Sequence, residues 1–304
     1  MRLSSIAWNV AGLAMPLAVA LLCVPPLLQR LGTERFGLLA LAWALTAISG
    51  LFDLGVGRAT TRQVAAQRGR GEAHRTRATL DAAVRIAALA GLVGALLLML
   101  AAAAGAHRGI RFDTALEPEV LQATLLLALV IPLQTLIATY RGASEACEQF
   151  RGISLLRMAL GAANFAAPLL VAQYTLHLAP LVLALLLVRL AACLAYRHLA
   201  LQALPGEGIA TTLSSQERRE LVLSGGWYSV SAIVSPVLVQ ADRFFIGALL
   251  SAAAVSTYAV PFDVVTQLLI VASAVSTVAL PSITQRLQTD VAAARAQFDR
   301  WLLI

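Results

Sequence analysis

Apolar runs close to 20 residues long recur along this chain and constrain its fold more than any other feature. A helix of about 20 apolar residues can cross the hydrocarbon core of a bilayer. We identify eight such runs, at residues 6–28, 37–57, 81–104, 119–140, 154–172, 178–196, 224–247 and 255–281. The sequence therefore predicts an all-α fold, a polytopic transmembrane helical bundle.

The composition excludes a soluble protein. Of the 304 residues, 59% are hydrophobic and 13% are charged, whereas an average soluble domain carries about 25% charged residues. The net charge of +7 could indicate a nucleic-acid partner. The basic residues, however, lie between the apolar runs, where they act as topology signals. We therefore expect the lipid bilayer, and no nucleic acid, as a partner.

Arginines are distributed unequally between the two sides of the predicted bundle. Connections that follow even-numbered spans hold most of them, and the stretch 58–79 carries Arg58, Arg62, Arg68, Arg70, Arg75 and Arg77. The opposite side holds Arg30, Arg35, Arg108 and Arg111. Positive loops stay in the cytoplasm. This predicts a multi-pass protein of the cell inner membrane with a cytoplasmic N-terminus.

The two ends of the chain need separate interpretation. Arg2 and the run up to Ala20 loosely resemble a cleaved signal peptide, but the run continues to Leu28 and favours an uncleaved helix. At the other end the chain stops four residues into a further hydrophobic segment, Trp301–Ile304. We expect from this that the sequence is part of a longer protein.

A polar stretch at residues 197–223 divides the chain. We predict an N-terminal six-helix transmembrane lobe at 1–200, a cytoplasmic inter-lobe linker at 201–223 and the first helices of a second lobe at 224–304. Beyond the linker the pattern of Trp8 followed by Pro16 recurs loosely as Trp227 followed by Pro236. The second lobe would then be pseudo-symmetric with the first, and paired bundles with a site between them recur in transporters.

These segments also resemble a known family. The pattern Asn9…Pro16…Leu31-Gly-Thr-Glu-Arg-Phe-Gly37…Asp53-Leu-Gly55 is similar to the opening of the polysaccharide (O-antigen) flippases of the MOP superfamily, which are MATE-like. The segment Gly226-Trp-Tyr…Asp242-Arg-Phe-Phe-Ile-Gly247…Tyr258 resembles the start of their second lobe.

The resemblance implies twelve or more helices in two lobes. It also implies a flippase that moves undecaprenyl-pyrophosphate-linked oligosaccharide across the inner membrane by alternating access, for lipopolysaccharide and other surface polysaccharide biosynthesis. The implied partners are that lipid-linked oligosaccharide and the polysaccharide polymerase and export machinery.

Charged residues inside the predicted spans are the main candidates for a substrate cavity, because an ionisable group at membrane depth usually faces a cavity or a partner. Arg189 lies near the middle of the sixth span and would suit a pyrophosphate; the alternative is an ion pair with a neighbouring helix. Asp242 and Arg243 lie about eighteen residues into the seventh span, where interfacial anchoring is the alternative. Asn9 and Gln240 are weaker candidates, since hydrogen bonding between helices is usual for such residues.

Asp53, Arg58 and Arg85 lie near the predicted inner surface. They could form a salt-bridged inner gate, or they could be ordinary interfacial residues.

No arrangement of residues for catalysis or cofactor binding is visible. The chain lacks a Gly-Lys-Ser/Thr phosphate loop, an Asp-rich Mg²⁺ motif and a His-Glu-x-x-His motif. Cys23, Cys147, Cys193 and the four histidines are scattered, without disulfide or metal-ligand spacing. We predict no enzyme, no cofactor and no metal site.

Three alternative functions stay open. A multidrug or small-solute exporter of the same superfamily would favour acidic residues in its cavity. A membrane-embedded glycosyltransferase or polymerase would need a large outer loop or a clustered acid and base. A non-transporting scaffold is the third alternative.

Overall fold

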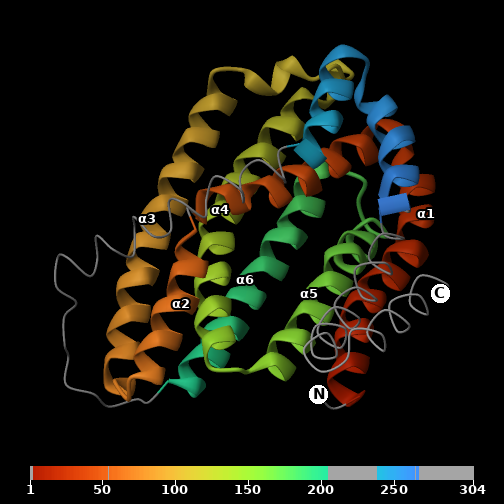
Figure 1. Cartoon of the computed structure of the whole chain (residues 1–304). Coiled ribbons are helices and arrows are strands. Elements are labelled where there is room, and N and C mark those ends of the chain that lie inside the picture. Colours follow the sequence, from red (N-terminus) through yellow and green to blue (C-terminus); the bar gives the residue numbers. More distant parts are fainter. Residues whose placement is uncertain (1–2, 54, 205–237, 264, 267–304) are drawn as a thin grey trace, which may run out of the picture.

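The computed structural model describes residues 3–53, 55–204, 238–263 and 265–266. Over these residues the chain forms α-helices and short 3₁₀-helices and contains no strand (Figure 1). Five helical segments in this part of the chain are long and apolar enough to cross a membrane: Ala18–Ile48, Ala73–Ala103, Thr114–Ala146, Phe150–Val171 and Leu178–Ala203. The predicted all-α membrane bundle is confirmed.

The α-helices in chain order are α1 (Leu3–Ile48), α2 (Val56–Gly69), α3 (Thr76–Ala103), α4 (Glu117–Ala146), α5 (Phe150–Val171) and α6 (Leu178–Ala203). Between them lie the 3₁₀-helices η1 (Ser49–Asp53), η2 (Ala73–Arg75), η3 (Ala106–Gly109) and η4 (Thr114–Leu116). Residues 238–249 and 252–263 are also helical.

The first two predicted spans appear as one helical element with a break. Gly32 has φ 72° and ψ 171° inside α1, a conformation that glycine adopts without steric cost. The chain changes direction there, so that α1 consists of a first arm (3–31) and a second arm (33–48) (Figure 1). The structure thus puts the break between the first two predicted spans at Gly32, and the helix geometry resumes at once.

The predicted second span, 37–57, and the predicted arginine-rich loop, 58–79, are both wrong in their bounds. The α-helix ends at Ile48, and residues 56–69 form α2. Within α2, Val56, Thr60 and Val64 are buried whereas Arg58 and Arg62 are exposed. The segment is therefore an amphipathic helix. Its surface arginines lower the mean hydropathy so far that a search for apolar runs takes it for a loop.

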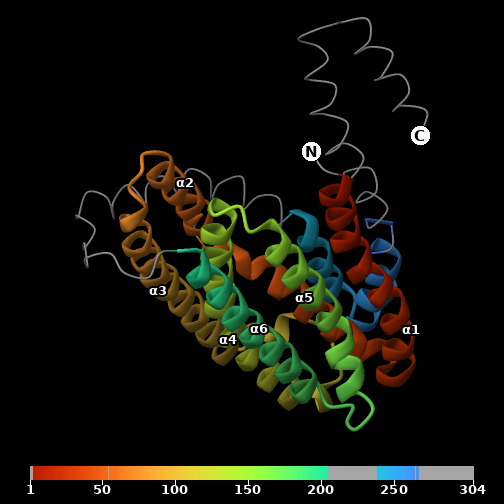
Figure 2. The same cartoon turned by 90° about the horizontal axis from the view of Figure 1, so that it is seen from below.

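Helix α4 is the centre of the first six helices. It packs against α2, α3 and α6, and α5 packs against α6 and α1. Figure 2 shows α3, α4, α6, α5 and α1 following one another across the bundle. The α2–α4 crossing depends on missing side chains, since a Cβ atom at Gly142 would overlap the backbone oxygen of Gly57. Small residues at helix crossings are usual in membrane bundles.

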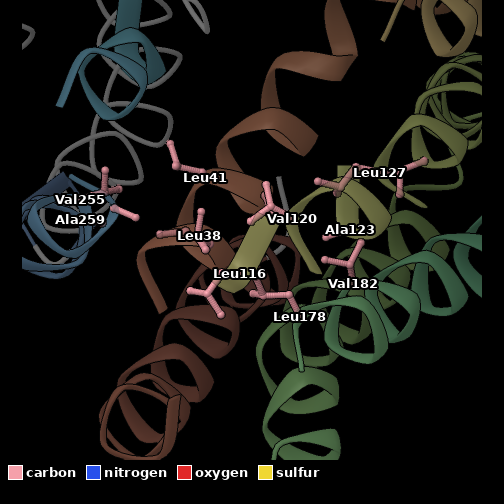
Figure 3. Packing of buried hydrophobic residues seen from close by; sticks show 14 residues of the cluster. Leu38, Leu41, Leu116, Val120, Ala123, Leu127, Leu178, Val182, Val255 and Ala259 are labelled. Atoms are coloured by element: carbon pink, nitrogen blue, oxygen red, sulfur yellow. The ribbon is translucent and has the colours of Figure 1, made fainter. Parts of the chain in front are cut away.

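Residues 238–263, which the sequence assigns to the second lobe, pack against the first lobe near the α3–α4 connection. An apolar cluster joins them, with Leu38 and Leu41 of the α1 second arm close to Val255 and Ala259 (Figure 3). The backbone of Arg111 also donates to the carbonyl oxygen of Gly247 at 2.9 Å and accepts from the backbone N–H of Ala252 at 2.8 Å. We call this pair of hydrogen bonds the backbone clasp.

The predicted lobe boundary lies mostly outside the described residues. Helix α6 continues to Ala203, beyond the predicted end of the sixth span at 196. The predicted linker from residue 205 onward, and the larger parts of the predicted spans 224–247 and 255–281, are not among the described residues. The division into two lobes therefore stays a prediction, as does the orientation in the membrane.

Candidate substrate cavity

A cavity of about 220 Å³ lies between the two predicted lobes. Both arms of α1 and helix α5 form one side, and residues 238–263 form the other. Its lining residues are Ala20, Leu21, Val24, Pro25, Phe36, Ala40, Trp43, Ala44, Asn164, Phe165, Gln240, Arg243, Ala259, Val260 and Asp263. Most are apolar, and the few polar groups among them come from α1, α5 and the helices at 238–249 and 252–263. Ligand sites usually combine an apolar wall with a few convergent polar groups.

Arg243 supplies the positive charge of this cavity. Its residue surface is only 3% exposed, and its Nη2 donates to Oδ1 of Asp263. The Phe262 ring lies beneath the guanidinium, with its centroid 5.9 Å from Cζ. The Asp263 side chain is 49% exposed. The cavity therefore presents a buried cation whose balancing carboxylate has room to move.

Three buried polar atoms on the cavity wall have no hydrogen-bond partner among the described residues. They are Nε1 of Trp43, Oε1 of Gln240 and Nε of Arg243. Leaving a buried donor or acceptor unpaired costs about 1–3 kcal/mol, so such atoms are uncommon unless water or a ligand satisfies them. Two donors and one acceptor, contributed from both sides of the cavity, indicate a site for a ligand that accepts and donates hydrogen bonds.

Arg189 does not line the cavity. Its Nη2 donates to Oδ1 of Asn164 at 3.4 Å, across the α5–α6 contact, and Asn164 does line the cavity. Within the described residues it forms no ion pair with a carboxylate, which was the alternative that the sequence left open. Arg189 therefore lies outside the cavity and is placed to orient the Asn164 side chain, which lines it.

Of the other predicted cavity residues, some line the cavity and some do not. Gln240 and Arg243 line the cavity, whereas Asp242 is exposed and accepts a hydrogen bond from the Tyr258 hydroxyl at 2.9 Å. Adjacent helical residues point about 100° apart, which explains how neighbours 242 and 243 can differ so much. The side chain of Asn9 lies outside the described residues.

The predicted inner-gate residues form no joint cluster. Asp53 accepts from the backbone N–H of Gly57 at 3.2 and 3.3 Å, and so satisfies a donor in the first turn of α2. Arg58 on α2 and Arg85 on α3 are exposed. No ion pair joins these three residues in the described part of the chain. Asp53 thus has a helix-capping role here, and the gate stays a prediction.

Sequence reasoning did not assign Trp43, Asn164 or Asp263 to the site. Asn164 and Asp263 carried a usable signal, since each is a polar residue inside a predicted span. Trp43 carried none, because an indole in an apolar run is unremarkable until its N–H proves to be buried without a partner. No group of three or more His, Cys, Asp or Glu residues that could hold a metal ion occurs in the described segments.

A bundle of membrane-length helices with a partly polar cavity is the architecture of a multi-pass membrane protein. A solved structure described as “Inward-facing conformation of a multidrug resistance MATE family transporter of the MOP superfamily” shares this fold. It matches with a TM-score of 0.69 over 95% of this chain and 69% of that chain, at 13% identity. The chain is a multi-pass membrane protein with the MATE transporter fold.

The family follows from the sequence comparison. The model of the family described as “Polysaccharide biosynthesis protein” matches residues 4–286, and the chain belongs to this family. A Shigella flexneri protein described as “Putative O-antigen transporter” is 26% identical over 277 residues. The match covers 91% of this chain, which spans 65% of that relative's length. The Shigella flexneri protein and the solved structure are both described as transporters rather than as enzymes, in agreement with the sequence-based prediction.

Proposed function

We propose that the protein is a flippase that moves undecaprenyl-pyrophosphate-linked oligosaccharide across the bacterial inner membrane for surface polysaccharide such as O-antigen. The observation that carries this proposal is the buried guanidinium of Arg243 on the wall of the inter-lobe cavity. Pyrophosphate is the charged part of such a substrate, and arginine binds phosphate oxygens through charge-assisted hydrogen bonds.

The unpaired atoms around Arg243 match the same chemistry. The Trp43 N–H and the Arg243 Nε–H are donors that phosphate oxygens would accept from. Oε1 of Gln240 is an acceptor suited to a sugar hydroxyl.

Alternating access requires contacts that close one end of the cavity. The apolar cluster around Leu41 and Val255, together with the backbone clasp at Arg111, closes the end near the α3–α4 connection. The arginine distribution predicts that this end is periplasmic and that the N-terminus is cytoplasmic. We propose that these contacts separate and re-form during each transport cycle, with polymerase and export machinery receiving the substrate outside.

Complementation tests this function. We expect the complete gene product to restore surface polysaccharide in a bacterial strain that lacks its own flippase, and the same protein carrying Arg243→Gln not to restore it. A wild-type protein that is inserted in the membrane yet restores no polysaccharide, with several polysaccharide types tried, would contradict the proposal.

One observation favours a second candidate, a multidrug or small-solute exporter. Asp263 is an acidic side chain on the cavity wall, and a cationic substrate would bind there. The candidate predicts that Asp263→Asn stops export of cationic compounds whereas Arg243→Gln does not. We prefer the flippase because the described wall offers one carboxylate that is already paired, against two unpaired N–H donors.

Arg189 should act on transport through Asn164. We expect Arg189→Ala to lower surface polysaccharide about tenfold, because a charge-assisted hydrogen bond contributes about 1.5–3 kcal/mol. Asn164→Ala should have a similar effect, and the double variant should be little worse than either, since both remove one interaction. Quantified surface polysaccharide is the measurement. Normal polysaccharide in the Arg189→Ala strain would contradict this role.

A further inference from the structure

A second cavity, of about 340 Å³, lies on the other side of the α1 second arm. Ala40 and Trp43 of this arm face the substrate cavity, whereas Leu41 and Leu45 face the second one. One helix is therefore the wall between the two cavities. We call the second one the apolar cavity.

Hydrocarbon side chains make up nearly all of its lining. Leu98 and Ala101 come from the C-terminal part of α3, Val120 and Leu127 from α4, and Phe244 and Ala248 from the helix at 238–249. Two exposed apolar ridges flank it, since Leu97 and Leu100 on α3 and Phe245 and Leu249 on the other helix are all exposed. In a membrane-spanning bundle these ridges face acyl chains, so a hydrocarbon chain can reach the cavity from the bilayer.

Apart from Thr124, whose hydroxyl donates to the carbonyl oxygen of Val120, the polar groups of the apolar cavity lie at one edge, at η3. The His107 ring is buried there, and its Nδ1 lies 3.2 Å from the carbonyl oxygen of Ala102. A carbonyl oxygen can only accept, so Nδ1 carries the proton. Nε2 has no hydrogen-bond partner among the described residues and lies 3.6 Å from Oε1 of Glu117. A buried, unpaired polar atom thus lies on the wall of an otherwise apolar space.

Positive charge lies next to this edge. Gly109 and Ile110 line the cavity, and their chain neighbours Arg108 and Arg111 both have exposed side chains. Nε of Arg108 donates to Glu117 at 2.7 Å, which leaves Arg111 as the better partner for an added anion. An apolar space with a cation and a buried imidazole nitrogen at one end matches a lipid with a phosphate and hydroxyl groups in its head.

We propose that the apolar cavity binds one acyl chain of an anionic glycerophospholipid from the bilayer. The head group lies at η3, its phosphate beside Arg111 and a head-group hydroxyl hydrogen-bonded to Nε2 of His107. The isoprenoid chain of the transported lipid is the competing occupant. It fits less well, because the α1 second arm separates this cavity from the one where the pyrophosphate would bind.

Photo-crosslinking tests the site. The complete protein, reconstituted in lipid nanodiscs, is irradiated with phosphatidylglycerol carrying a diazirine in its acyl chain, and the labelled peptides are mapped. We expect label on residues 98–110.

Filling the cavity with Ala101→Phe or, from the opposite wall, Ala248→Phe should weaken labelling at least about tenfold, because each buried methylene contributes roughly fourfold in affinity. Ala103→Phe is the matched control, exposed on the same helix and outside the cavity.

Arg111→Gln tests the head-group part without changing buried packing. It should remove the preference for phosphatidylglycerol over a phosphatidylcholine probe of the same chain. Undiminished labelling in either filled variant that elutes as a folded protein overturns the proposal. Label confined to Leu92 and Leu96, which are exposed on α3 outside the cavity, also overturns it. Stronger labelling by a diazirine polyprenyl phosphate than by phosphatidylglycerol overturns it in favour of the carrier lipid. Equal labelling of the parent protein by the two phospholipids overturns the assignment to an anionic head.

Discussion

Replacing Arg243 with glutamine should lower surface polysaccharide in the complementation assay about 100-fold or more. Hydrogen bonds to charged groups each contribute about 1.5–3 kcal/mol, so the loss of two to a pyrophosphate corresponds to a factor of that size. Glutamine also leaves Asp263 without its ion partner beside the cavity, and an uncompensated carboxylate repels phosphate. Quantitative detection of surface polysaccharide in the strain lacking its own flippase is the measurement.

Two further variants separate transport from folding. Removing one partner of a fully buried ion pair destabilises a protein by about 3–5 kcal/mol, whereas removing both can be nearly neutral. Arg243 is buried but the Asp263 side chain is half exposed, so we expect a smaller loss of stability from Arg243→Gln alone. The double variant Arg243→Gln/Asp263→Asn should therefore regain thermal stability in detergent but not transport. Arg62→Gln, which changes an exposed arginine of α2 in the same way, should transport normally. Recovery of transport in the double variant would show that Arg243 contributes structure alone.

Replacing Gly37 with leucine should prevent the two predicted lobes from closing at the end near the α3–α4 connection. Gly37 is buried on the α1 second arm, and a Cβ atom added there would overlap the carbonyl oxygen of Ala252. The obstacle is backbone at the first turn of the helix at 252–263, so it cannot move aside as a flexible side chain would. Overpacking of this kind costs about 1–3 kcal/mol or more, which shifts a two-state equilibrium about tenfold to a hundredfold.

The reporter for this closure is a cysteine at position 256. Ser256 is 2% exposed and its backbone nitrogen lies at the same contact with Gly37. With Ser256→Cys, we expect a membrane-impermeant maleimide added to whole cells to react at least about tenfold faster in the Gly37→Leu protein. Transport should fall by a similar factor.

Gly69→Leu is the matched control, because a Cβ atom there meets nothing within 4 Å. The protein without Ser256→Cys gives the background from the three native cysteines. Unchanged labelling together with normal transport in the Gly37→Leu protein would show that this contact does not have to close.

The structure changed the interpretation of the charged residues more than that of the helices. Arg189 and Asp242 had the same sequence argument as Arg243, an ionisable residue in an apolar run. Only Arg243 of the three lines the cavity, while Arg189 bonds to Asn164 behind it and Asp242 bonds to Tyr258 at an exposed position. Hydropathy predicts how deep in the membrane a charged residue lies. It does not predict whether that side chain faces the cavity, a neighbouring helix or the lipid.

The same distinction explains the error at residues 49–69. Mean hydropathy depends on every residue in a window, so the exposed arginines of α2 outweigh its buried face. Val56, Thr60 and Val64 are four residues apart, which is the spacing of one helix face. The glycines at the start of the segment and its many arginines nevertheless favoured a loop. Only packing against α4, where Gly57 and Gly142 let the backbones approach, shows the segment to be part of the bundle.

By itself the sequence determined the class of this protein, because the length and apolarity of a membrane span are local properties that each segment carries alone. It also supplied the candidates for the cavity, since an ionisable residue in an apolar run stands out without a structure. The tertiary structure decided which candidates meet. The cavity joins Trp43, Asn164, Arg243 and Asp263 from helices far apart in the chain, and their proximity depends on how non-local helix faces pack, which no single segment encodes.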